Sequence, residues 1–211
     1  MKIVVVLIML LPAIYSFAQV DENMPDTRSK NESFAKMPKN EWRTDLACFT
    51  MGGIDESAGK GDLKIVSFSG FTANSMSFEG EGVKAVVTTA PFDENKHKLQ
   101  YSDQYLIKID RKTYYGGYPN LPKTFISQVS MIIDKDTVAI PAVAYADLFN
   151  LNLVYKDKTG TERSKNAIYF SKYGNRVYLY LFCKDQTGSY EVTFIIQDKK
   201  YIRRVVDYGF M

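Results

Sequence analysis

A period of two in the last third of the chain constrains the fold more than any other feature. Between residues 190 and 197, a set of apolar side chains alternates with a set that is mostly polar. The apolar set is Tyr190, Val192, Phe194 and Ile196, and the other set is Glu191, Thr193, Ile195 and Gln197. Successive side chains of a strand point to opposite faces, so this pattern predicts a half-buried strand.

The runs on either side of this strand extend the pattern into a three-stranded unit. Residues 177–183 are apolar on both faces, which predicts a central strand covered on both sides. Residues 201–210 carry Arg203 and Asp207, and charges there predict an edge strand protected from pairing with another chain. Gly188 can supply a positive φ in the first turn, while Asp198-Lys199 is a poorer candidate for the second.

Further strand-like runs continue towards the N-terminus, and short polar turns separate them. They cover residues 42–50, 63–69, 76–79, 83–89, 103–110, 125–133, 137–140, 151–156 and 166–171. Asp134-Lys135-Asp136 is expected to form a hairpin turn. The one convincing helix covers residues 141–149, with Pro141 at its start. The sequence therefore predicts an all-β fold, an antiparallel sandwich or closed barrel of about ten strands with one short helix.

The N-terminus has the pattern of a secretory signal peptide. Lys2 precedes a short apolar run that ends at Ser16-Phe17-Ala18, so cleavage is expected after Ala18. No later segment is apolar over the ~20 residues that a membrane-spanning helix needs. We therefore predict a signal peptide at 1–18, a flexible polar linker at 19–41 and a single β-rich domain at 42–211, exported to the periplasm or the extracellular space.

Charge and short motifs exclude several classes of function. The formal net charge of +3 falls to +2 without Lys2, and no long basic block is present, so we expect no nucleic-acid binding. Ala58-Gly59-Lys60-Gly61 lacks the first glycine and the final Ser or Thr of a phosphate loop. The glycines at 80–85 precede a strand-like run, whereas a dinucleotide site needs a helix there. With His97 as the sole histidine, we expect no cofactor and no metal site.

The chain has two cysteines, Cys48 and Cys183. In an exported protein, an isolated pair of cysteines favours a disulfide, which here would join the first strand to the C-terminal sheet. The alternative is two buried thiols that do not meet.

Three tyrosines form the candidate binding site. Tyr114, Tyr115 and Tyr118 surround a Gly-Gly turn, and exposed aromatic rings in that arrangement would provide a stacking platform for sugar rings or for a protein partner. The alternative is that the three rings cap the core at an edge of the sheet.

The sequence resembles exported, uncharacterised β-rich proteins of Bacteroidota. The resemblance rests on Ser16-Phe17-Ala18-Gln19, on residues 190–196 and on Arg204-Val205-Val206-Asp207. It is carried by the leader and by strand residues of the final third, so it implies an exported β-rich fold and no activity.

Three functions fit these features. The first is an exported, non-catalytic binding or protein-interaction module of unknown ligand. The second is a carboxylate-based hydrolase of the glycoside hydrolase type, with Glu79, Asp103 and Asp134 among the available acids. The third is a small outer-membrane β-barrel, which is disfavoured because residues 177–183 do not alternate and Arg204 interrupts the suitable face of the last strand.

Overall fold

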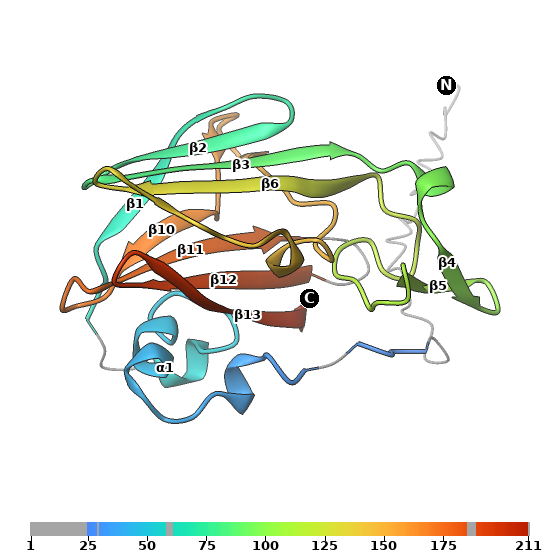
Figure 1. Cartoon of the computed structure of the whole chain (residues 1–211), viewed down its shortest axis with the longest axis horizontal. Helices are drawn as coiled ribbons and strands as arrows, with labels where there is room; N and C mark the ends of the chain where they lie inside the picture. The colour runs from blue at the N-terminus through green and yellow to red at the C-terminus, as the bar shows by residue number, and fades with distance from the viewer. Residues whose placement is uncertain (1–24, 29, 58–60, 185–188, 211) are drawn as a thin grey trace, which may run out of the picture.

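The computed structural model describes residues 25–28, 30–57, 61–184 and 189–210. Within these ranges, one nine-stranded antiparallel sheet has the strand order β13-β12-β11-β10-β1-β2-β3-β6-β7. The sheet folds over and almost closes on itself, which confirms the predicted all-β fold class (Figure 1). The predicted signal peptide at 1–18 and the turn at Gly188 lie outside the described residues.

The strands fall into one large sheet and two small ribbons. The large sheet contains β1 (Ile65–Phe71), β2 (Ser75–Gly80), β3 (Val83–Pro91), β6 (Thr124–Ile133), β7 (Asp136–Val138), β10 (Ala167–Phe170), β11 (Arg176–Cys183), β12 (Ser189–Gln197) and β13 (Lys200–Phe210). The ribbons are β4 (Leu99–Ser102) with β5 (Tyr105–Ile109), and β8 (Tyr155–Lys156) with β9 (Glu162–Arg163).

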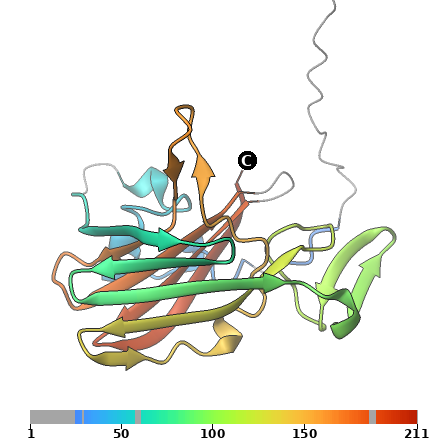
Figure 2. The same ribbon diagram turned by 90° about the horizontal axis from the view of Figure 1, so that it is seen from above.

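The large sheet forms two layers that cross over each other (Figure 2). We call β1, β2, β3, β6 and β7 the upper layer, and β10 to β13 the lower layer. The main core lies between them, and it contains inward-facing residues of both, among them Phe78, Val87, Leu179 and Phe194. Burial of these alternate positions removes apolar area from water and stabilises the folded sheet.

The two ends of the strand order approach each other through their turns. Lys199, in the turn between β12 and β13, places its Nζ 2.8 Å from Asp134 Oδ2 and 2.9 Å from Asp136 Oδ2, at the turn between β6 and β7. The predicted hairpin turn at 134–136 is confirmed, and β13 is confirmed as an edge strand. Asp198 and Lys199 form the two-residue turn in the left-handed region, at φ 49° and 61°.

The prediction for β11 is confirmed, since all its residues from Arg176 to Cys183 are buried. The prediction of a half-buried β12 is wrong on one point. The strand and its alternation are present, but the polar side is buried as well, with Glu191 2% and Thr193 1% exposed. A covering segment from the N-terminal part of the chain accounts for this.

Residues 25–28 and 30–57, which we call the strap, lie along the outer face of β11, β12 and β13 (Figure 1). Its buried apolar side chains pack against Tyr178, Ile195 and Val205 of the sheet. They are Phe34, Met37, Leu46 and Ala47. Within residues 30–41 of the expected flexible linker, Phe34 and Met37 are therefore packed against the sheet, because these few apolar residues in a polar stretch contact a complementary surface.

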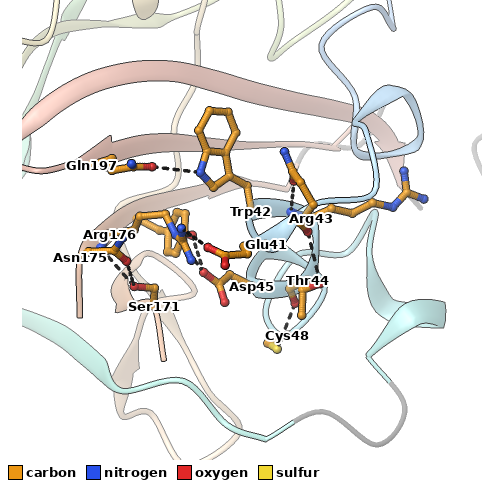
Figure 3. A network of polar contacts seen from close by, with 12 residues as sticks. Glu41, Trp42, Arg43, Thr44, Asp45, Cys48, Ser171, Asn175, Arg176 and Gln197 are labelled. Carbon is orange, nitrogen blue, oxygen red and sulfur yellow. Dashed lines mark hydrogen bonds and ion pairs between the residues drawn. The ribbon is translucent and has the colours of Figure 1, made fainter. Parts of the chain in front are cut away.

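The strap contains α1 (Glu41–Leu46), where the sequence pattern predicted a first strand at 42–50. That prediction is wrong because Asn40 caps a helix: its Oδ1 accepts a hydrogen bond of 3.1 Å from the Arg43 amide. Figure 3 shows α1 facing the ends of β11 and β12. Arg176 Nη1 lies 2.7 Å from Glu41 Oε2 and its Nε lies 3.3 Å from Asp45 Oδ2.

A buried and a half-buried carboxylate of the sheet hold the backbone of the strap. Glu191 accepts hydrogen bonds from the amides of Met51, at 2.8 Å, and Gly52, at 2.7 Å. Asp207 accepts one of 2.8 Å from the Phe34 amide. The charge that was predicted to protect an edge therefore binds another part of the same chain.

The predicted helix at 141–149 is reduced to a single 3₁₀ turn, η4 (Ala142–Ala144). Leu148 and Phe149 instead form isolated β-bridges, with Tyr115 and with Phe125. The Tyr115 amide donates to the Asp147 carbonyl at 2.9 Å, and the Phe149 amide donates to the Tyr115 carbonyl at 2.8 Å. Pairing with a distant segment outweighs the local helix preference here.

Candidate ligand-binding site

The three tyrosines predicted to bind ligand are core residues. Tyr114, Tyr115 and Tyr118 are 1%, 4% and 0% exposed. The Tyr114 hydroxyl has two carbonyl acceptors within reach of its single hydrogen, Asn120 at 2.9 Å and Leu106 at 3.2 Å. In this conformation no ligand can stack on these rings, so the structure corrects the stacking-platform interpretation and favours the alternative of a cap on the core.

The tight packing of this loop depends on the glycine next to the tyrosines. Gly116 has φ +95°, and a Cβ atom there would lie 2.0 Å from the Phe149 carbonyl oxygen. The Gly-Gly turn therefore brings the tyrosine rings inward instead of presenting them to solvent.

The predicted disulfide is not formed. Both cysteines lie in the described part of the chain, and no bond joins them. Cys48 follows α1 on the strap, and its Sγ donates to the Thr44 carbonyl at 3.4 Å. Cys183 belongs to the main core, and its Sγ donates to the Asn150 carbonyl at 3.0 Å. The two thiols thus lie on opposite faces of the lower layer.

A hollow of about 370 Å³ lies at the base of the hairpin formed by β8 and β9. This hairpin projects from the body of the molecule (Figure 2). We call the cavity the hairpin hollow, and it is lined by Asn152, Val154, Tyr155, Lys165, Phe182 and Lys184. Its size and its mixture of apolar and polar side chains are typical of small-ligand sites.

The floor of the hairpin hollow is held by two asparagines. The Asn166 side-chain amide donates to the Asn152 carbonyl at 2.8 Å and accepts from the Phe182 amide at 2.8 Å. Asn152 Oδ1 accepts from the Lys184 amide at 2.6 Å. These bonds connect the end of β11 to the segment that leads into the hairpin, so the lining residues have a fixed relative position.

Asp157 fixes the tip of the hairpin. Its Oδ1 accepts from the amides of Thr159, at 2.9 Å, and Thr161, at 3.0 Å, and its Oδ2 accepts from Arg163 Nε at 3.1 Å. The hydrogen bonds from the Thr159 side chain and from Arg163 lower the pKa of Asp157 to about 2. The hairpin therefore projects as an ordered element with a charged tip.

Positive charge and an exposed ring meet in the hairpin hollow. Lys165 Nζ lies 4.6 Å from the centre of the Phe182 ring, a cation–π contact that holds the ammonium group in place. Within the described chain, neither Lys165 nor Lys184 forms an ion pair with a carboxylate. Tyr155 is 48% exposed and offers a ring face to a ligand. The site can therefore stack a flat apolar surface and neutralise an acid.

The acids considered for hydrolysis are not brought together. Glu79 pairs with Lys84 at 3.4 Å, Asp134 pairs with Lys199, and Asp103 lies in the turn between β4 and β5. Asp134 lies beside Gly82, in the turn that follows the strand of Glu79, but each of these two carboxylates is bound to its own lysine, and Asp103 belongs to another hairpin. Among the described residues, no group of three or more His, Cys, Asp and Glu side chains is arranged to hold a metal ion.

Comparison with known proteins gives no match: no family model, no curated protein and no solved structure matches this chain. None of the helices in the described residues has the length and apolar character needed to cross a bilayer. Only the geometry of the chain itself therefore bears on its function. Sequence reasoning missed the hairpin hollow because Tyr155, Lys165 and Phe182 lie far apart in the sequence and form no motif.

Proposed function

We propose that this protein is an exported, non-catalytic binding module, and that the hairpin hollow takes an acidic saccharide unit such as a uronic acid. The observation that carries the proposal is the pairing of Lys165 and Lys184, two ammonium groups with no carboxylate partner in the described chain, with the exposed ring of Tyr155. A uronic acid matches both features, because its pyranose ring has an apolar C–H face and also bears a carboxylate.

Each group has a defined part in this proposal. The Tyr155 ring stacks on the apolar face of the sugar, while its hydroxyl group stays in contact with water. Lys165 and Lys184 bind the carboxylate through charge-assisted hydrogen bonds. The carbonyl groups of Asn152 already accept hydrogen bonds, which leaves its amide nitrogen as the donor for sugar hydroxyls.

The test is a calorimetric titration with a galacturonic acid trisaccharide and with its neutral galactose counterpart. We expect saturable binding of the acidic sugar and at least about tenfold weaker binding of the neutral one. A hydrogen bond to a charged group contributes about 1.5–3 kcal/mol, and about 1.4 kcal/mol corresponds to a tenfold change in affinity. Tyr155→Ala and Lys165→Gln should each weaken binding of the acidic sugar by about tenfold.

Tyr173→Ala and Lys172→Gln are matched controls. Tyr173 is 76% exposed in a different turn, and Lys172 is an exposed lysine beside it. Both controls should leave the affinity unchanged. Equal binding of the acidic and neutral sugars, or equal losses in the site and control variants, would contradict the proposal.

A further inference from the structure

A second hollow lies at the junction of four segments of the chain. It has a volume of about 480 Å³ and lies where the loop after β5 meets η4, β13 and the strap. Its charged and hydroxyl-bearing lining residues are Thr27, Lys108, Arg111, Lys112, Thr113, Asp147 and Arg204. We call it the basic cleft. It shares no lining residue with the hairpin hollow.

One of the cations in the basic cleft is fully neutralised. Arg204 binds Asp147 through two hydrogen bonds of 2.5 and 2.7 Å, and its Nε lies 2.9 Å from Glu32 Oε2. It also donates to the Ala144 carbonyl at 2.8 Å. Arg204 and Asp147 therefore form part of the wall of the cleft. Through Glu32 and Asp147, Arg204 also joins β13 to the strap and to the segment after η4.

The other three cations are not neutralised in this way. Within the described residues, Lys108, Arg111 and Lys112 form no ion pair with a carboxylate. They come from β5 and from the turn that follows it, so three positive charges border one cavity. Like charges that are held close together repel each other, and a bound anion would relieve this repulsion.

The turn that carries these charges is held in position. Ile109 and Lys112 exchange backbone hydrogen bonds of 3.0 and 2.9 Å, and Asp110 and Arg111 between them have φ of 50° and 67°. Asp110 Oδ1 accepts from the Lys98 amide at 2.9 Å. The turn therefore has a defined conformation before any ligand arrives.

His97 adds a second support to the turn. Its Nδ1 donates to Asp110 Oδ2 at 2.7 Å, and its ring stacks on Phe92 with the centres 4.6 Å apart. The hydrogen bond from His97, together with that from the Lys98 amide, lowers the pKa of Asp110. Asp110 therefore stays ionised and bound to these two donors, and His97 is a positioning residue for the cationic turn.

We propose that the basic cleft binds a tetrahedral oxyanion of the sulfate or phosphate class. Several observations favour this ligand over a sugar ring. The cleft has three cations that form no ion pair among the described residues, although Lys112 is also attracted by the Asp110 carboxylate. It further has the hydroxyls of Thr27 and Thr113, and no aromatic ring lines it. The guanidinium of Arg111 offers a planar fork that matches two oxygens of such an anion, and lysines add point charges.

The test is a calorimetric titration of the full chain with inorganic sulfate, inorganic phosphate and a monosaccharide sulfate ester. The titration is run at a low ionic strength of about 10 mM, where the Debye length is about 30 Å and charges in the cleft are only weakly screened. The double variant Arg111→Asn/Lys112→Gln should weaken binding of the inorganic anions by at least about tenfold. Asn tolerates the left-handed conformation at position 111, so the turn is preserved.

The control is Lys158→Gln/Lys172→Gln, which removes the same charge from exposed turns elsewhere. It should bind like the parent chain. Tighter binding of the ester than of free sulfate identifies a sulfated glycan as the source of the group, and equal binding identifies the free ion. Absence of saturable anion binding, or equal losses in both double variants, would overturn this inference without affecting the hairpin hollow.

Discussion

The two outer faces of the folded sheet have opposite surroundings. The outer face of β11 to β13, the covered face, lies beneath the strap, and its polar residues Glu191 and Thr193 are buried. The outer face of β1, β2, β3 and β6, the open face, carries exposed residues such as Ser67, Lys84 and Ser127. Each face includes a strand in which polar and apolar residues alternate, β12 on the covered face and β2 on the open face.

The comparison teaches that alternation identifies a strand but does not show what lies on its polar side. On the open face, hydroxyl groups bond to the adjacent strand. Ser77 Oγ donates to the Gly70 carbonyl at 3.1 Å, and Ser127 Oγ donates to the Thr88 carbonyl at 3.1 Å. On the covered face, Glu191 binds backbone amides more than a hundred residues away in the sequence. Burial of a carboxylate requires such partners.

Replacement of Glu191 by alanine should have the largest effect on stability. It removes the acceptor for the Met51 and Gly52 amides and for the Tyr180 hydroxyl, which donates to Glu191 Oε2 at 2.7 Å. Buried donors without a partner are costly, so we expect the free energy of unfolding to fall by about 4 kcal/mol. Urea denaturation followed by circular dichroism measures it.

The control for this variant is Glu79→Ala on the open face. The Glu79 side chain is 64% exposed, and it pairs with an exposed lysine. Pairs of this kind contribute at most about 1 kcal/mol, so the midpoint should hardly move. Similar losses of unfolding free energy for Glu191→Ala and Glu79→Ala would show that the polar residues of the covered face contribute no more to stability than those of the open face.

The same contrast shows which parts of the fold were predictable. Most strands of the large sheet followed from local strand-like runs, although the strand predicted at 42–50 was wrong, and the β6–β7 turn followed from Asp134-Lys135-Asp136. The strap was missed because Phe34 and Met37 are isolated apolar residues in a polar stretch, and their partners Ile195 and Val205 lie far along the chain. Contacts of such separation leave no local signal.

The candidate sites were less predictable than the strands. Tyr114, Tyr115 and Tyr118 suggested a binding surface because they surround a Gly-Gly turn. The direction in which their rings point, however, depends on the close approach of Gly116 to Phe149. Asn40 did offer a readable signal, because Asn followed by Glu41 is a common start of a helix. The basic cleft had none, because Arg204 and Arg111 meet only in the folded chain.

A second prediction compares apolar residues of the two faces. Leu46, on the strap, is 0% exposed, whereas Ile132, on the open face, is 39% exposed. Leu46→Ala should lower the free energy of unfolding by about 3 kcal/mol, since it leaves a cavity between the strap and the sheet. Ile132→Ala should cost less than about 1 kcal/mol, because much of its side chain is already in water. Equal shifts of the urea midpoint would argue that the strap does not pack tightly.

The smallest expected effect is a pH dependence that belongs to the covered face. Burial raises the pKa of Glu191 and of Asp207 in the folded protein, despite the hydrogen bonds from strap amides that favour their ionised forms. The folded state therefore holds these protons more tightly than the unfolded chain does. As pH rises above about 4.3, the ordinary value for Glu, the unfolded chain releases its protons first, so stability falls with pH.

Glu191→Gln isolates this contribution, because its side chain does not titrate while its oxygen can still accept a hydrogen bond. Urea midpoints of the parent chain and the variant, measured from pH 4 upwards, should approach or cross as the parent loses stability relative to the variant. Asp207 remains in both proteins, so apart from its electrostatic coupling to Glu191 its own contribution is common to both. A parent chain that gains stability relative to the variant over this range would mean that the hydrogen bonds from the strap amides outweigh burial and favour the ionised carboxylate.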